Sequence, residues 1–246
     1  MECKLGIAYN TSIVRNGLVL HLDAANVKSY PGSGTAWNDL SGNNKNGTLV
    51  NGVSFVTANN GGLFFDKVND YVSVTNSYSS PSLPTGSSSR TIITCFKTSS
   101  SFSGLPFEHI VHYGSRSQGQ AYGVALFLLN GQYYISNHTW TGTSYMNNYP
   151  VTTNTLYWVA VTYNDTSSPR NSFYVNGSFG TVGFGQGTVA DYTINTGTGF
   201  QLNIGTRIGP AEYFGGEVYF VQVYNRALTA TEISQNYNAL RGRYSI

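Results

Sequence analysis

The chain has 246 residues, 40% of them hydrophobic, so a single domain of this length can bury a large core without the help of disulfides. Charged residues make up 10% of the chain and the net charge is only +2, which excludes the clustered lysines and arginines that a nucleic-acid-binding surface needs. No apolar run approaches the roughly 18 residues of a membrane-spanning helix, so we expect no membrane insertion.

Alternating apolar and polar residues recur along the whole chain and predict β-strands. In the first run, 18–23, the three leucines point to one face and Val19, His21 and Asp23 to the other. Further runs of this kind lie at 62–65, 71–74, 90–96, 108–113, 122–129, 133–136, 156–163, 171–175, 200–204 and 216–224. No helical pattern separates them, which argues against βαβ units and favours an all-β sandwich of two antiparallel sheets.

Local signals predict two tight turns and one helix in this pattern. The dipeptides Asn130-Gly131 and Asn176-Gly177 predict tight hairpins. Near the end, Thr229 and Glu232 form the sequence signature of a capping box. Ile233, Tyr237 and Leu240 follow with helical spacing, which predicts one short helix packed on the sandwich.

The domain organisation is simple. We find neither a linker nor a repeat, so we predict one sandwich domain over 16–246, preceded by an N-terminal arm or edge strand over 1–15. Cys95 lies in an apolar run and is expected to be a small buried residue. Cys3 lies in a peripheral segment, and we expect no disulfide between the two. Trp37 and Trp158 are predicted to be buried.

The acidic residues argue against catalysis. A glycosidase needs two carboxylates about 5 to 9.5 Å apart, which on one strand requires acids at i and i+2 or i+4. The eleven acids are scattered, and Glu217 stands alone on its strand. A Gly-x-Ser-x-Gly elbow is also missing from the sequence. The sequence therefore predicts a protein that is not an enzyme.

One loop has the composition of a calcium site. The segment 39–47 places Asp39, Asn43 and Asn46 in a tight turn, and calcium takes six to eight oxygen ligands. The same loop has a single carboxylate and contains Lys45. Asx turns, in which Asp and Asn side chains bond their own backbone, account for these residues without an ion. Both interpretations stay open, and calcium is the candidate cofactor.

The histidines suggest a second metal. His109 and His112, next to Glu108, are residue types that bind zinc. On a regular strand, residues three apart point to opposite faces, so we do not expect these two to share an ion. His21 and His138 have no partner nearby in the sequence. Strand histidines held by hydrogen bonds are the favoured interpretation.

The segment 138–149 has the composition of a sugar-binding platform. Its candidate residues are three aromatic rings and two amides: Trp140, Tyr145, Tyr149, Asn147 and Asn148. Exposed rings stack on the apolar faces of sugars, and amides hydrogen-bond their hydroxyl groups. The alternative is that these rings pack in the core or against another subunit, and we favour this alternative.

The order of several short motifs resembles concanavalin A-like, laminin-G-type jelly rolls, above all those of bacteriophage virion proteins. The likeness spans 16–243. It is carried by Asn16-Gly17-Leu18-Val19-Leu20-His21-Leu22-Asp23, Trp37-Asn38-Asp39-Leu40-Ser41-Gly42-Asn43, Tyr174-Val175-Asn176-Gly177 and Val223-Tyr224-Asn225-Arg226-Ala227-Leu228-Thr229.

The resemblance implies a jelly-roll sandwich, and by analogy a non-enzymatic virion protein such as a capsid decoration, fibre or tail-associated subunit. Other virion proteins and further copies of the chain are the expected partners. The N-terminus lacks the apolar core of a signal peptide, so we expect synthesis in the host cytoplasm and a place in the virion. The alternative is a lectin or adhesin module that recognises host-surface polysaccharide. A glucan hydrolase is the least favoured function.

Overall fold

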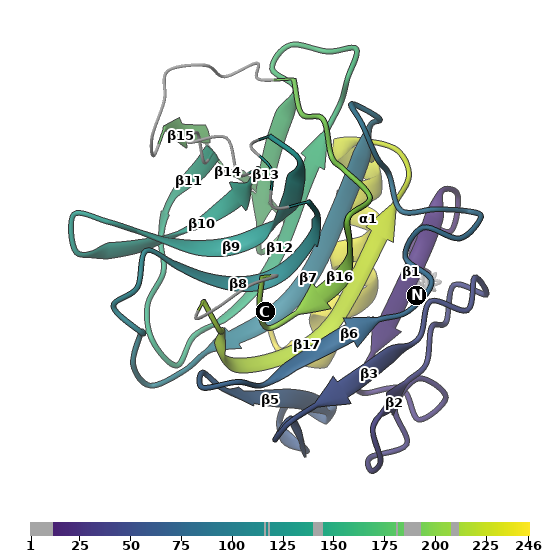
Figure 1. Cartoon of the computed structure of the whole chain (residues 1–246). Helices are drawn as coiled ribbons and strands as arrows, with labels where there is room; N and C mark the ends of the chain where they lie inside the picture. The colour runs from purple at the N-terminus through teal and green to yellow at the C-terminus, as the bar shows by residue number, and fades with distance from the viewer. Residues whose placement is uncertain are drawn as a thin grey trace, which may run out of the picture.

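In the computed structural model, the described residues form two antiparallel sheets that pack face to face and one α-helix that lies outside them (Figure 1). The structure describes residues 12–115, 117, 119–139, 145–180, 182–184, 193–207 and 212–246, with 145–148 and 182–184 described by their backbone alone. Within these ranges, no helix is long and apolar enough to cross a membrane.

The first sheet has eight strands. Their order across the sheet is β14 (Ser178–Gly180), β13 (Asn171–Val175), β12 (Leu156–Tyr163), β7 (Arg90–Thr98), β17 (Gly215–Tyr224), β5 (Gly62–Asp66) and β4 (Ser54–Val56), and β1 (Leu18–Asp23) also pairs with β17. The long strand β17 pairs with β7 along one edge, and along the other edge β5 pairs with its first half and β1 with its second half.

The second sheet has nine strands. Their order is β15 (Val182–Phe184), β11 (Tyr145–Pro150), β10 (Gln132–His138), β9 (Ala121–Leu129), β8 (Phe107–Gly114), β16 (Phe200–Ile204), β6 (Tyr71–Val74), β3 (Gly47–Val50) and β2 (Ala36–Trp37). Neighbouring strands in both sheets run antiparallel, which confirms the predicted two-sheet sandwich.

The main core lies between the two sheets. The predicted alternation holds in the second half of β1, where Leu20 and Leu22 are fully buried in this core. It is wrong at the start of the strand, because the register shifts between Leu18 and Leu20, so Val19 joins the core and Leu18 packs against a separate apolar cluster on the other face. The other face of β1 is covered as well, because Asp23 pairs with Arg243 of the helix at 2.7 Å. Trp37 is fully buried, as predicted.

Both predicted hairpins are present. The turn between β9 and β10 has positive φ at Asn130 (50°) and Gly131 (80°). The turn between β13 and β14 has the same conformation at Asn176 (49°) and Gly177 (77°). Positive φ at both central residues is what a tight two-residue hairpin requires, and Asn-Gly tolerates it best.

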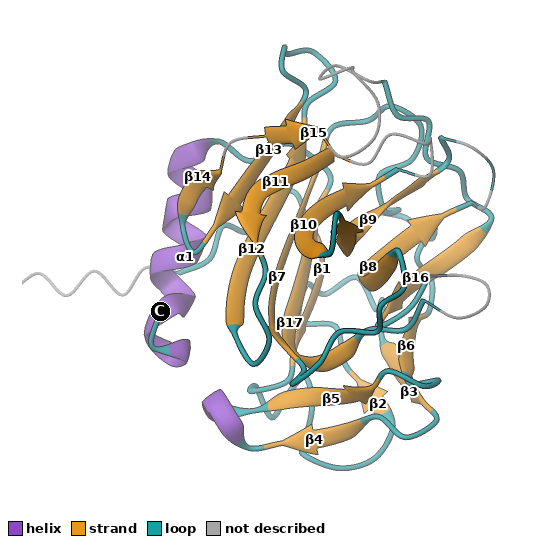
Figure 2. Cartoon of the chain, turned by 90° about the vertical axis from the view of Figure 1, so that its left-hand side faces the viewer, coloured by secondary structure: helices purple, strands orange, loops and turns teal. Residues whose placement is uncertain are grey.

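The predicted helix is α1 (Ala230–Tyr244), which lies on the outer side of the first sheet (Figure 2). The capping box is formed: the Glu232 N–H donates to Thr229 Oγ1 at 3.3 Å, and the Thr229 N–H donates to Glu232 Oε2 at 2.9 Å. Ile233 and Leu240 are buried against the sheet, in a second apolar cluster. The confirmed cap and stripe fix where the helix begins and which side it buries.

A short η1 turn (Ala58–Asn60) precedes β5.

The second apolar cluster, between α1 and the first sheet, contains Cys95 and Trp158, both fully buried as predicted. The Trp158 ring meets Tyr237 of the helix edge-on at 5.4 Å. Cys3 lies outside the described residues.

The described part of the N-terminal segment rests on the helix. The N–H of Val14 donates to Asn236 Oδ1 at 2.7 Å, and its carbonyl accepts from the Tyr224 hydroxyl at 2.9 Å. Gln235 donates to the Ser12 carbonyl at 2.8 Å. Residues 1–11 lie outside the described ranges, so the predicted arm or edge strand over 1–15 stays a prediction.

A β-bulge in β8 changes which side chains share a face. The ladder from β8 to β9 pairs His109 with Ala125 and resumes at Val111, so Ile110 is an extra residue without a partner. An extra residue reverses the alternation beyond it, and His112 therefore projects from the same face as His109. The expectation that these two histidines point to opposite faces is wrong, because it assumed a regular strand.

Candidate functional site

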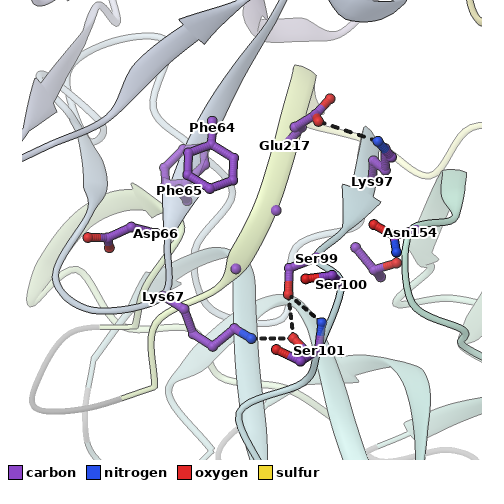
Figure 3. Close-up of a pocket in the computed structure, with 13 residues that line it drawn as sticks. Phe64, Phe65, Asp66, Lys67, Lys97, Ser99, Ser100, Ser101, Asn154 and Glu217 are labelled. Carbon is purple, nitrogen blue, oxygen red and sulfur yellow. Dashed lines mark hydrogen bonds and ion pairs between the residues drawn. The ribbon is translucent and has the colours of Figure 1, made fainter.

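A pocket of about 340 Å³, open to solvent, lies at the ends of β5, β7 and β17 (Figure 3). Charged, amide and hydroxyl side chains line most of it, and the phenylalanine ring of Phe64 borders it. The segment 99–101 and Asn154 close it on the side of β7. The pocket therefore combines polar groups with one exposed aromatic face.

Strand register aligns three of its side chains. Glu217 of β17 lies directly opposite Phe64 of β5 on one side and Lys97 of β7 on the other. Opposed residues project from the same face of a sheet, so ring, carboxylate and ammonium form one row, which we call the Phe64 row. The helix covers the nearby positions Cys95 and Tyr219, but it leaves Phe64 38% exposed.

An ion pair and a hydrogen bond hold the carboxylate at the centre of the Phe64 row. Lys97 Nζ lies 3.5 Å from Glu217 Oε1, and the two side chains are 31% and 16% exposed. The Tyr219 hydroxyl donates to the same carboxylate and accepts from Asn59 Nδ2 at 2.7 Å. Burial, followed by the hydrogen bond to Glu217, raises the pKa of Tyr219. The phenol therefore stays protonated and remains a donor.

The floor of the pocket depends on a glycine. Gly216 has a φ of 137°, and a Cβ there would overlap the carbonyl oxygen of Lys97. On the opposite side, Lys67 Nζ donates to the carbonyl of Ser101 (Figure 3). The exposed amide of Asn154 completes the rim. A ligand with several hydroxyl groups would meet both donors and acceptors here.

Two acids line the pocket, but they do not face each other. In Figure 3 the carboxylates of Asp66 and Glu217 point in different directions. Asp66 Oδ1 accepts the backbone N–H groups of Val68 at 2.7 Å and Asn69 at 3.3 Å, so it closes its own turn. Glycoside hydrolysis needs two carboxylates on opposite sides of one bond, and Asp66 and Glu217 are not arranged in this way.

The predicted aromatic platform is described only in part. Trp140 lies outside the described residues. Three other members belong to β11 and are described by their backbone alone: Tyr145, Asn147 and Asn148. Tyr149 is 49% exposed, and its ring meets Tyr157 edge-on at 6.2 Å. A sugar platform in this segment stays a prediction, with Tyr149 as its one member known to lie at the surface.

The three predicted calcium ligands lie together in the loop after β2, where their polar atoms bond the protein itself. Four donors reach the Asp39 carboxylate at 2.7 to 3.1 Å: the N–H groups of His21, Ser41 and Lys45, and the Ser41 hydroxyl. Asn46 Oδ1 accepts the Asp39 N–H at 2.9 Å, and Asn43 Nδ2 donates to the Val19 carbonyl at 3.2 Å. These contacts match the Asx-turn alternative, and the calcium site stays a prediction.

The ammonium group of a buried lysine lies close to this loop. Lys45 is fully buried, and its ammonium donates to the carbonyls of Asn76 at 2.8 Å and Ser79 at 3.0 Å. Burial lowers the pKa of Lys45, and the charge of Asp39 opposes that shift. A positive charge at the loop fits a structural turn better than a divalent ion.

Three histidines form a cluster that is not predicted by the spacing of these residues in the sequence. His109, His112 and His138 place one ring nitrogen each within 4.8 Å of one another on the outer face of the nine-stranded sheet. His138 comes from β10, beyond the intervening strand β9. Gly123 in the middle of β9 was the one available signal, since glycine inside a strand often accompanies a bulge or a close backbone approach.

The chain matches the model of one protein family. A family model described as the concanavalin A-like lectin/glucanases superfamily matches residues 65–234, which is more than half of the chain. This match agrees with the two-sheet jelly roll and with the resemblance seen in the sequence. No curated protein sequence matches the chain.

Solved structures share the fold at low identity. The binding domain of Paraclostridial Mosquitocidal Protein 1 has a TM-score of 0.66 and 15% identity, over 92% of this chain and 52% of that one. Domain 4 of AbnA, a GH43 extracellular arabinanase from Geobacillus stearothermophilus, in complex with arabinotriose, has a TM-score of 0.61 and 12% identity, over 89% and 98%. Trypanosoma rangeli sialidase has a TM-score of 0.57 and 18% identity over 92% of this chain, which spans only 33% of the sialidase.

Proposed function

Because this chain belongs to the concanavalin A-like lectin/glucanases superfamily, we propose that it is a non-enzymatic binding domain that recognises a glycan at the Phe64 row. The observation that carries the proposal is the alignment of an exposed ring with a fixed carboxylate and an ammonium across three neighbouring strands. Binding sites of this kind combine an apolar surface with a few well-placed polar groups.

The chemistry of the pocket suits a saccharide. The exposed face of Phe64 can pack on the C–H face of a sugar ring, as aromatic rings do in recognition sites. Glu217 accepts hydrogen bonds from hydroxyl groups, and Lys97 donates to them. Such bonds to charged groups are the stronger ones. The Tyr219 hydroxyl holds the Glu217 carboxylate in place, so less rotamer freedom is lost when the ligand binds.

A binding role fits the acids of the pocket better than hydrolysis does. Glu217 is engaged by Lys97 and Tyr219, and Asp66 caps its own turn. We therefore expect no release of reducing sugar from arabinan or β-glucan.

The virion role implied by the sequence resemblance is compatible with glycan binding, and we propose it as the setting of this domain. It is supported by the order of motifs over 16–243 and by the low share of charged residues, 10%. Mass spectrometry of purified phage particles tests it, together with the oligomeric state of the isolated chain. A chain that is absent from particles and remains monomeric would count against this role.

A glycan array that includes arabino-oligosaccharides and sialylated glycans tests the binding proposal. We expect the wild-type chain to retain at least one glycan, Phe64→Ala to lose it, and Tyr149→Ala to keep it. Loss in Tyr149→Ala or Trp140→Ala alone would move the site to the aromatic platform of 138–149. A wild-type chain that retains no glycan would remove the binding proposal.

A further inference from the structure

Strand register brings three histidines together on the outer face of the nine-stranded sheet. Gly123 of β9 pairs with His112 of β8 on one side and with His138 of β10 on the other. Strands lie about 4.8 Å apart, so the flanking Cα atoms are roughly 10 Å apart, a span that two imidazoles can close. A Cβ on Gly123 would overlap the carbonyl oxygen of Val111, so only glycine lets the bulged strand approach this closely.

The bulge adds the third histidine to the same face. The ring centroid of His109 lies 5.1 Å from that of His112 and 4.6 Å from that of His138. The three residues are 0%, 2% and 3% exposed. Phe107 stacks on His109 at 5.6 Å and meets His138 edge-on at 4.7 Å. The cluster is therefore closed on one side by an apolar wall.

The ring nitrogens of two of these histidines lack partners. Among the described residues, none hydrogen-bonds either ring nitrogen of His112 or the Nδ1 atom of His109. Buried polar atoms are nearly always paired, because leaving them unpaired costs free energy. The unpaired ring nitrogens of His109 and His112 are therefore available as metal ligands.

A carboxylate fixes the orientation of His109. Glu212 Oε2 lies 2.9 Å from His109 Nε2 and 2.8 Å from Arg207 Nε. The carboxylate can only accept, so Nε2 carries the proton and the lone pair stays on Nδ1. The backbone adds a further tie, since the His109 N–H donates to the Glu212 carbonyl at 3.4 Å. Metal-binding histidines are commonly oriented by a carboxylate in this way.

We propose that His109, His112 and His138 form a binding site for a divalent transition metal ion, for which zinc is the best match, with Glu212 as the carboxylate that orients His109. Imidazole nitrogens suit zinc, copper and nickel, whereas calcium and magnesium prefer oxygen ligands. Three nitrogen ligands leave a fourth position for a water molecule or another small ligand.

The geometry requires only a small adjustment on binding. Zinc–nitrogen bonds of about 2.0–2.1 Å in a tetrahedron place ligand nitrogens about 3.3 Å apart, and the cluster already holds them within 4.8 Å. Rotation of the imidazoles can bring them closer without moving the strands. An ion at this point would tie β8 to β10 across β9, so we expect the melting temperature to rise with zinc concentration.

Calorimetric titration of the chelator-treated full chain with zinc chloride tests the site. We expect one zinc ion per chain, and an affinity for His112→Gln lower by about 100-fold or more, since even outer-shell losses cost roughly 10–100-fold. His21→Gln is the matched control, because His21 is also buried but lies in β1 of the other sheet. This variant should keep the wild-type affinity.

Anomalous diffraction at the zinc edge on wild-type crystals provides a second test that does not depend on the folding of a variant. The expected result is one peak between the rings of His109, His112 and His138. A peak elsewhere, a chain that binds none of zinc, cobalt and copper, or an affinity unchanged in His112→Gln would overturn the proposal. Glycan binding at the Phe64 row is unaffected by any of these results.

Discussion

His112 and His138 lie directly across Gly123, one on each neighbouring strand, and their ring centroids are 5.6 Å apart. The bulge at Ile110 turns His109 to the same face, so a local irregularity in one strand creates a three-residue cluster. The same bulge sends Ile110 and Val111 into the core between the sheets. One inserted residue thus places two apolar side chains in the core and brings the buried histidines together on the opposite face of the sheet.

We predict that Glu212→Gln weakens zinc binding by roughly 10–100-fold, the usual effect of losing an outer-shell carboxylate. The amide keeps the size of the side chain but removes the acceptor charge that favours a proton on His109 Nε2. The stoichiometry should remain one ion per chain, because no ligand is lost. Calorimetric titration measures both quantities. Glu217→Gln, an acid in the other sheet, is the control and should leave zinc affinity unchanged.

A second prediction concerns acid stability at the start of α1. Hydrogen bonds from Arg226 lower the pKa of Glu232 to about 2. The folded-state pKa lies below the ordinary value, so the carboxylate contributes stability above pH 4.5 that is lost as the pH falls towards 2. The contribution is at most about 3 kcal/mol, and solvent screening of this 25% exposed side chain reduces it.

Urea unfolding between pH 5 and pH 2.5 measures this contribution. Wild type and Glu232→Gln should differ most at pH 5 and converge as the pH falls, since both side chains are then uncharged. Other groups titrate in the same range, but they do so equally in both proteins. A constant difference across this range would show that the ion pair with Arg226 does not stabilise the fold.

Much of the fold could be predicted because its signals are local. Asn130-Gly131 turns a hairpin by itself, since both residues accept positive φ at little cost. Thr229 and Glu232 close a capping box within four residues. Alternation in β1 placed Leu20 and Leu22 in the core. In each case the residues that decide the structure lie next to one another in the sequence.

The candidate sites depend on contacts that the sequence does not carry locally. Phe64, Lys97 and Glu217 come from three separate strands, and only the register of β17 against two partners aligns them. His138 meets His112 across an intervening strand, and the bulge at Ile110 breaks the period of two. Alternation predicts the face of a side chain only within an unbroken ladder.

A third prediction concerns Asp39 and the loop after β2. Asp39→Ala removes the acceptor of three backbone N–H groups and the Ser41 hydroxyl, and we expect a loss of about 2–4 kcal/mol in the free energy of unfolding. The neighbouring exposed residue provides the control, Asn38→Ala, which should change stability by less than about 0.5 kcal/mol. Urea unfolding measures both.

Addition of calcium distinguishes the two interpretations of that loop, which are a calcium site and an Asx turn without an ion. The oxygens of Asp39 already accept protein donors, among them the backbone N–H of Lys45, and the buried ammonium of Lys45 interacts electrostatically with the Asp39 carboxylate. We therefore expect millimolar calcium to leave the melting temperature of the wild-type chain unchanged. A rise that disappears in Asp39→Ala would instead support the calcium site predicted at Asp39, Asn43 and Asn46.

A fourth prediction concerns the buried amide of α1. Asn236 Oδ1 accepts from the Val14 N–H at 2.7 Å, and its Nδ2 donates to the Tyr224 hydroxyl at 3.0 Å. Asn236→Leu keeps the branched shape of the side chain but leaves the Val14 N–H without an acceptor, which should cost about 2–3 kcal/mol. Asn238→Leu on the exposed side of the same helix is the control. Equal losses in the two variants would show that the amide bonds do not hold residues 12–15 to the helix.

The last prediction separates binding from stability at the Phe64 row. Lys97 is 31% exposed and its ion pair with Glu217 spans 3.5 Å, so Lys97→Met should change the free energy of unfolding by less than about 1 kcal/mol. The same change removes a charged donor from the pocket, and we expect glycan affinity to fall roughly tenfold, the equivalent of about 1.4 kcal/mol. Calorimetric titration with the glycan found on the array measures the second effect. Lys28→Met, an exposed lysine away from the pocket, should leave affinity unchanged, and an equal loss in that variant would attribute the effect to net charge instead of to Lys97.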